Sequence, residues 1–237
     1  TANNTSGRLV DSTIANGIYF TSPSTMQITG NTLTNYDAFP TRIGANSVGP
    51  FLANNTLQGV VAGSSCLEVL GEVITQSTTW PNNLIYVVFG TVSVYGPTNP
   101  ILTIEPGVEV RFSYEGLLGI GGRTSTQAGG LLAQGTATQP ILFTSNQTTK
   151  TRGYWGGILF QDLALDTSIL EHCVVEYGGG PYFYTLLSLS SASPTLRNLT
   201  LQESSNRGLD ISNANPTISN STIQNVSGTG INISYAS

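Results

Sequence analysis

The acidic side chains are the first candidates for chemistry in this sequence, because enzymes that cleave polysaccharides depend on them. A glycosidase needs two carboxyl groups that converge on one groove. A lyase that holds Ca²⁺ needs several carboxylates, together with an Arg or Lys that takes the proton. The thirteen acidic residues are scattered, and the nearest pairs are Asp162/Asp166, Glu171/Glu176 and Glu105/Glu109. None of these pairs aligns with a third acid one repeat away, so the sequence predicts no catalytic residue.

We also expect no catalytic role for the only lysine and the only histidine of the sequence. Lys150 lies in the segment SNQTTKTRGYW, which we expect to be a solvated loop. His172 occupies a repeat position that is Asn elsewhere, and we expect it in a turn, which leaves no credible Ser/His/Asp triad. The glycine runs GIGG (119–122) and GGG (178–180) precede no helix, so they do not predict a phosphate-binding loop. We predict no cofactor-binding and no metal-binding residue.

Eight N-x-S/T triplets raise the question of N-glycosylation. Three of them, at Asn54, Asn198 and Asn220, coincide with a repeated sequence frame that explains them without a glycan. The others lie off that frame, in loops or at outward strand positions, and are the better candidates. They are Asn3, Asn4, Asn146, Asn225 and Asn232.

An aromatic cluster and two cysteines remain. The cluster is a candidate contact patch for sugars or proteins, although core packing or anchoring of loops also explains such residues. Its members are Tyr154, Tyr177, Tyr182, Phe183 and Tyr184. Cys173 lies in the apolar run SILEHCVVEY, which is typical of a buried thiol. The sequence leaves a Cys66–Cys173 disulfide open, because it does not show whether the two residues are close.

Charge and hydropathy exclude two classes of partner. The net charge is −5 and Lys and Arg are not clustered, so we expect no nucleic-acid partner. The longest apolar run, LIYVVFG (84–90), has the length of a strand and not of a membrane span. The sequence opens TANNTSG without an initiator Met, so we expect a processed or excised segment of an extracellular protein.

The composition predicts an all-β chain. Only 9% of the 237 residues are charged, there are 27 Gly, and Ser and Thr together make up about a quarter of the chain. Such a chain suits short strands and frequent turns. No long stretch shows helical periodicity free of Gly, Pro or β-branched runs.

An internal repeat specifies the kind of β fold. The segment Leu196-x-Asn198-x-Thr200-Leu201 matches Ile218-x-Asn220-x-Thr222-Ile223, and the same frame fits around residues 9, 28, 52 and 170. Successive matches lie 19, 24, 26 or 22 residues apart. A second short strand follows several copies, for example GLDIS (208–212) and GINIS (230–234). This period is typical of one coil of a β-solenoid.

Stacked coils place equivalent residues beside each other, roughly 4.8 Å apart. We therefore predict apolar inward columns, polar outward columns, and a column of turn residues. The inward columns are Leu170–Leu196–Ile218 and Val175–Leu201–Ile223. The outward neighbours are Glu171 with Arg197, Glu176 with Gln202 and Gln224, and Asp210 with Ser188 and Asn232. The turn column contains Asp11, Gly30, Asn54, His172, Asn198 and Asn220.

An ordered series of motifs resembles a known family. TTW, LTIEPGVEVRF, GGLLAQGTATQPILFTSN, WGGILF and ILEHCVVEYGG follow one another over about residues 66–180. This succession resembles the right-handed parallel β-helix domains of secreted and surface proteins, within the pectate-lyase-like superfamily. The resemblance implies the fold, whereas members of the family range across adhesins, surface repeats and enzymes.

The order of segments suggests how the chain is used. We expect the end of a β-helix unit at residues 1–61, a cap-like linking segment at 62–100 and a parallel β-helix at 101–237. The regular coil at the end of the sequence indicates either a unit of a tandem or self-stacking array or a shortened segment. We expect a non-enzymatic structural or adhesive surface protein that associates with itself and offers sites for glycosylation. The alternative is a β-helix that binds or cleaves carbohydrate.

Overall fold

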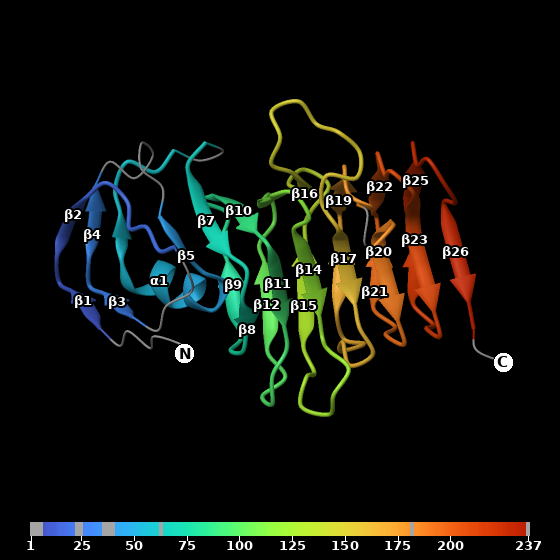
Figure 1. The fold of residues 1–237 in the computed structure, drawn as a ribbon, viewed down its shortest axis with the longest axis horizontal. Coiled ribbons are helices and arrows are strands. Elements are labelled where there is room, and N and C mark those ends of the chain that lie inside the picture. Colours follow the sequence, from blue (N-terminus) through green and yellow to red (C-terminus); the bar gives the residue numbers. More distant parts are fainter. Residues whose placement is uncertain (1–6, 22–25, 35–40, 62–63, 181–182, 236–237) are drawn as a thin grey trace.

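The protein is a right-handed parallel β-helix, as predicted, in a computed structural model that describes residues 7–21, 26–34, 41–61, 64–180 and 183–235. Regular coils contribute one strand to each of three sheets, so strands far apart in sequence become neighbours along the axis (Figure 1). Every strand pair between the described residues is parallel, since each coil runs in the same direction as the last. The pairs begin with β1 on β3 and end with β23 on β26.

Three long sheets form the walls of the helix. The eight-stranded sheet contains β5 (Arg42–Gly44), β7 (Cys66–Leu70), β10 (Ile85–Phe89), β13 (Glu109–Phe112), β16 (Ile141–Ser145), β19 (Cys173–Glu176), β22 (Thr200–Gln202) and β25 (Thr222–Gln224). The seven-stranded sheet contains β8 (Val73–Ile74), β11 (Thr91–Val94), β14 (Leu117–Ile120), β17 (Gly157–Phe160), β20 (Thr185–Ser190), β23 (Arg207–Ser212) and β26 (Ile231–Ser234). The six-stranded sheet contains β9 (Thr78–Trp80), β12 (Ile101–Ile104), β15 (Gly130–Gln134), β18 (Ile169–Glu171), β21 (Thr195–Arg197) and β24 (Thr217–Ser219).

The N-terminal coils form two smaller sheets beside a short helix. The sheets are β1 (Arg8–Val10) with β3 (Gln27–Thr29), and β2 (Thr13–Ala15) with β4 (Thr32–Thr34) and β6 (Thr56–Leu57). A 3₁₀ turn, η1 (Ala45–Ser47), leads into helix α1 (Val48–Asn54), which lies between β3 and β9. No helix in the described part of the chain has the length and apolar character needed to cross a bilayer.

Helix α1 corrects the expectation that the repeat frame continues through residues 52–57. Leu52 and Asn54 are helical, and only Thr56 and Leu57 enter a strand. Val48 and Phe51 point into the core from one face of the helix, and this burial outweighs the weak helical propensity of the segment. Asn55, and not Asn54, forms the side-chain hydrogen bond to the neighbouring coil. The amide of buried Asn31 donates to Asn55 Oδ1 at 2.9 Å. Asn54 instead donates to the carbonyl of Pro50.

The predicted apolar columns form the core. Leu170 pairs with Leu196 and Leu196 with Ile218, while Val175 pairs with Leu201 and Leu201 with Ile223. Large aromatic residues fill the wider parts of the interior. Trp80 stacks on Tyr86 with ring centroids 4.7 Å apart, and Phe112 stacks on Trp155 at 4.1 Å. Stacking equivalent apolar residues removes their surface from water on both sides, which is the main stabilising effect in such a fold.

The predicted outward neighbours are confirmed as well. Arg197 Nη2 lies 2.7 Å from Glu171 Oε2, and this hydrogen bond lowers the pKa of the Glu171 carboxyl. Asp210 pairs with Ser188 on one side and Asn232 on the other. Side-chain hydrogen bonds along the axis thus replace most of the charges that a soluble surface usually carries.

The turn column adopts the left-handed backbone conformation that its composition suggested. His172, Asn198 and Asn220 have φ of 46°, 54° and 49°, and Asp11 and Gly30 are also positive. Asn198 Nδ2 lies 3.3 Å from His172 Nε2, so the column also carries a side-chain contact between coils. His172 is therefore a turn residue. Asn and Gly tolerate this conformation better than other residues.

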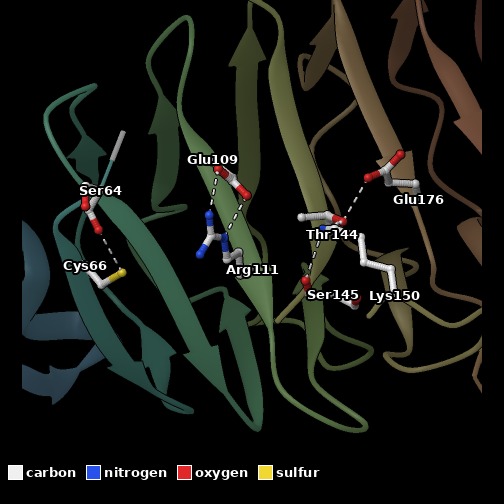
Figure 2. Close-up of polar contacts among 8 residues, drawn as sticks. All are labelled: Ser64, Cys66, Glu109, Arg111, Thr144, Ser145, Lys150 and Glu176. Atoms are coloured by element: carbon white, nitrogen blue, oxygen red, sulfur yellow. Dashed lines mark hydrogen bonds and ion pairs between the residues drawn. The ribbon is translucent and has the colours of Figure 1, made fainter. Parts of the chain in front are cut away.

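The open question of a Cys66–Cys173 disulfide is decided against the bridge, since both residues are reduced thiols. Cys66 lies on β7 and Cys173 on β19, and β10, β13 and β16 separate these strands. Four strand spacings amount to roughly 19 Å, whereas the Cα atoms of a disulfide lie at most about 7 Å apart. The Cys66 thiol donates to the Ser64 carbonyl (Figure 2), and Cys173 is buried in the core.

The two thiols should differ in reactivity. Burial raises the pKa of Cys173 to about 12, so little thiolate forms near neutral pH. We expect iodoacetamide at pH 8 to modify Cys66 before Cys173 in the folded protein, and both residues equally after denaturation. Peptide mass spectrometry measures the two rates. A non-reduced sample in which neither cysteine reacts after denaturation would contradict the absence of a bridge.

Substitutions at Asn198 test the turn column. Asn198→Val forces a β-branched residue into the left-handed region, which costs about 1–2 kcal/mol. Asn198→Gly loses the same contact with His172 but keeps the favoured backbone. We expect the free energy of unfolding in urea to fall further for Val than for Gly. Equal losses would show that the side-chain contact, and not the backbone, determines the residue type.

Candidate functional site

A polar cleft of about 350 Å³ lies on the outward face of the eight-stranded sheet. Its floor comes from β13 and β16, and its wall comes from residues 146–156, which connect β16 to β17 and are called the Lys150 loop below. In Figure 1 this loop is the yellow segment that projects beyond the strand ends near β16 and β19. The lining residues are Glu109, Arg111, Ser145, Asn146, Gln147, Thr148 and Lys150.

Strand register brings the charged residues of the cleft together. Arg111 on β13 pairs with Thr144 on β16, and Thr144 contacts Glu176 on β19. The three side chains point outward, because residues at alternate positions of each strand face the core. Thr144 is nevertheless fully buried, since it lies next to the Lys150 side chain.

A chain of hydrogen bonds runs from the loop across three strands, and Figure 2 shows its part from Lys150 through Thr144 to Glu176. Lys150 Nζ donates to Thr144 Oγ1 at 2.6 Å and to the Ser145 carbonyl at 3.3 Å. Thr144 Oγ1 in turn donates to Glu176 Oε1 at 3.0 Å. Gln202 Nε2 donates to the other oxygen of Glu176 at 2.8 Å. Both carboxylate oxygens of Glu176 are therefore hydrogen-bonded.

Opposing effects act on the pKa of Lys150. Burial lowers the pKa of its ammonium group, while the carboxylates of Glu176 and Glu109 oppose this shift. Arg111 acts in the same direction as burial, because like charges repel. Arg111 itself binds Glu109 with two hydrogen bonds, Nε to Oε1 at 2.7 Å and Nη2 to Oε2 at 3.2 Å. That pairing raises the pKa of the guanidinium.

The Lys150 loop is fastened to coils further along the axis. Arg152 Nη2 lies 2.8 Å from Glu203 Oε2, and Arg152 Nη1 donates to Ser227 Oγ at 3.4 Å. The ammonium of Lys150 lies 5.6 Å from the centre of the Tyr177 ring. The prediction of a loop at Lys150 is confirmed, but the expectation that the side chain is merely solvated is wrong.

Three of the acidic residues considered in the sequence accept hydrogen bonds from different parts of the chain. Asp162 accepts a hydrogen bond from Ser190 Oγ, and Asp166 accepts one from the backbone N–H of Ser193. Glu105 accepts one from the backbone N–H of Asn82. Among the residues that the structure describes, no group of three or more His, Cys, Asp or Glu could hold a metal ion.

The members of the predicted aromatic patch differ in their contacts and in their exposure. The Tyr154 ring packs edge-on against Tyr114 with centroids 5.7 Å apart, and sequence reasoning missed Tyr114 as a member. Tyr114, Phe183 and Tyr184 are exposed, whereas Tyr177 borders Lys150. Tyr182 lies outside the described residues. The exposed rings remain candidates for a contact surface.

The sequons differ in accessibility. Asn146 lines the cleft, and Asn225 is exposed with φ of 52°. The amide of Asn232 donates to Asp210 Oδ1 at 2.6 Å, so this candidate is engaged in the outward column. Asn198 and Asn220 lie in the turn column, as the repeat frame indicated. Asn3 and Asn4 lie outside the described residues.

Comparison with known proteins agrees with this geometry. Residues 71–180 match the family model described as a pectate-lyase like beta helix domain. This segment is a pectate-lyase-like β-helix domain. No curated protein and no solved structure matches the chain significantly. The polar cleft lies inside the pectate-lyase-like domain, because β13, β16 and β19 all fall within the matched residues.

Sequence reasoning missed the cleft because its members come from coils of unequal length. Thr144 follows its partner Arg111 by 33 residues (144 minus 111) and precedes Glu176 by 32. The later coils of the repeat frame are 22 or 26 residues long. The outward position of Thr144 in the strand ILFTS was the one available signal, and it does not reveal the loop above it.

Substitution of Thr144 tests the chain of hydrogen bonds. Thr144→Val keeps the volume of the side chain but removes the hydroxyl that bonds to both Lys150 and Glu176. A buried polar group left without its hydrogen bond lowers the free energy of unfolding by about 1–3 kcal/mol. Thr144→Ser keeps the hydroxyl and is the matched control. We expect the valine variant to lose more free energy of unfolding than the serine variant at pH 7. Equal stability of the two variants would show that the hydroxyl contributes nothing.

Proposed function

We propose that the chain is a structural unit of an extracellular surface protein that works through shape and coil-on-coil association. The observation that carries this proposal is the outer face of the last described coil. Ile218, Ile231 and Ile233 are 39%, 45% and 58% exposed there. The residues on which they stack, Leu196, Leu209 and Ile211, are almost fully buried.

This face is suited to packing against a further coil and is poorly suited to exposure to water. Its apolar side chains continue the inward columns, and β24, β25 and β26 each present a strand edge for another parallel strand. Tyr235, 64% exposed, lies next to them. A coil of another copy of the chain would cover this face and extend the solenoid.

A non-enzymatic role is part of the same proposal. The described carboxylates around the axis are mainly engaged in hydrogen bonds between coils, such as Glu171 with Arg197 and Glu176 with Gln202. Carboxylates held in this way contribute to the stability of the stack. The alternative, a β-helix that binds or cleaves carbohydrate, draws its support from the cleft and from exposed Tyr114, which packs against Tyr154 of the Lys150 loop.

Extracellular location and glycosylation complete the proposal. Two observations support them: the surface carries few charges, and Asn225 presents an exposed sequon. Glycans would supply hydration that a charge-poor surface lacks. The exposed aromatic residues Tyr114 and Tyr184 support an adhesive contribution.

Charged substitutions on the last coil test association. We expect the 237-residue chain to associate with rising concentration in sedimentation velocity, and to form elongated particles in electron microscopy. Ile233→Lys should weaken this association at least tenfold, because lysine on an exposed strand edge blocks further pairing. Val61→Lys is the matched control, since Val61 is 52% exposed but lies far from the last coil.

Two outcomes would contradict the proposal. One is a chain that stays monomeric at all concentrations, or that responds equally to both lysine substitutions. The other is depolymerisation of an acidic polysaccharide by the purified chain, which would favour the enzymatic alternative.

A further inference from the structure

We propose that the cleft under the Lys150 loop binds a small oxyanion, the phosphate or sulfate group of a compact ligand, through Arg111 and Lys150. This site is separate from the face that supports coil association. Both residues line the cleft, one from β13 and the other from the loop above it. Figure 2 shows them on the same outward surface, with Glu109 beside Arg111 and Thr144 beside Lys150.

The hydrogen bonds in the cleft leave N–H donors of both cations available to a ligand. Each oxygen of Glu109 accepts a bond from Arg111, and each oxygen of Glu176 accepts one from Thr144 or Gln202. Lys150 has three N–H donors and uses two of them, on Thr144 and on the Ser145 carbonyl. The Arg111 guanidinium has five and uses two on Glu109. An acceptor-rich ligand complements such a surface.

The charges in the cleft balance, because Glu109 and Glu176 equal Lys150 and Arg111 in number. An oxyanion would therefore be held by the N–H donors of the two cations that the carboxylates do not occupy. Arg111 and burial both lower the pKa of Lys150. Each of them therefore adds a free-energy cost to the charged form of the ammonium. An oxyanion between Lys150 and Arg111 would offset that cost through charge-assisted hydrogen bonds. The planar guanidinium also matches the geometry of two oxygens of one phosphate or sulfate.

The size and remaining lining of the cleft limit the ligand. A volume of about 350 Å³ is near the lower end of small-molecule sites. Asn146, Gln147 and Thr148 add neutral polar groups at the rim. These features suit a compact hydrophilic molecule with one oxyanion and hydroxyl groups.

The single lysine provides a direct probe. Protein labelled with ¹³C-lysine has one ε-carbon signal, whose chemical shift follows protonation of Lys150. We expect saturable shifts on titration with inorganic phosphate or sulfate at constant ionic strength, with chloride as the reference anion. Saturation should also raise the pKa of Lys150, because a bound anion stabilises the charged form. Glu109, Arg111, Glu176 and Tyr177 are the other titratable groups facing Lys150, and they are present in both states.

Variants assign the binding to this cleft. Arg111→Gln should weaken phosphate or sulfate binding at least tenfold, whereas Arg123→Gln, in an exposed loop, should leave it unchanged. Asn146→Asp adds a negative charge at the rim without altering the Glu109–Arg111 pair, so it tests the site even if Arg111→Gln impairs folding. We expect it to weaken binding as well.

Three results would overturn the proposal. The first is a lysine signal that responds to chloride as it does to phosphate and sulfate. The second is a folded Arg111→Gln variant that binds as tightly as the unchanged protein. The third is Asn146→Asp binding that equals that of Arg123→Gln. These measurements report anion binding in one cleft and not the association of chains. Their failure would therefore leave the proposal of coil association intact.

Discussion

Parallel pairing of each coil with the next, in register, is the constraint on which the rest of the structure depends. It places equivalent residues directly above one another, so an apolar residue in one coil is buried only if its neighbours are apolar as well. Leu170, Leu196 and Ile218 show this, because the first two are buried and the third is exposed where no described coil covers it. Stability therefore accumulates along the axis, and each coil depends on its neighbours.

The same register explains how a surface with few charges is stabilised. The outward positions carry hydroxyls, amides and single ion pairs that bond from one coil to the next, as in the series Thr144, Glu176, Gln202 and Gln224. The turn between two strands needs a left-handed residue at each coil, and Asn or Gly meets this need at low cost. Repetition of these residue types is thus a consequence of geometry, and the sequons at Asn198 and Asn220 arise in this way.

Features with functional potential appear where the repetition is interrupted. The Lys150 loop lengthens one coil, folds over the outward face and brings an amine beside Thr144 and Arg111. Helix α1 interrupts the line of strands between β3 and β9. The regular coils provide a rigid frame, and the departures from the frame create a cleft with donors that the frame does not satisfy. The pectate-lyase-like domain in this chain therefore combines a repetitive scaffold with a polar cleft.

The sequence by itself determined the fold class, the inward columns and the pairing of Glu171 with Arg197, because coil lengths between residues 170 and 235 are nearly constant. It also placed His172 in a turn. The tertiary structure alone decided that residues 48–54 are helical, that Cys66 and Cys173 lie four strands apart, and that Lys150 and Arg111 line the same cleft. These features depend on distances between segments joined by loops of unequal length, and a periodic pattern carries no information about such distances.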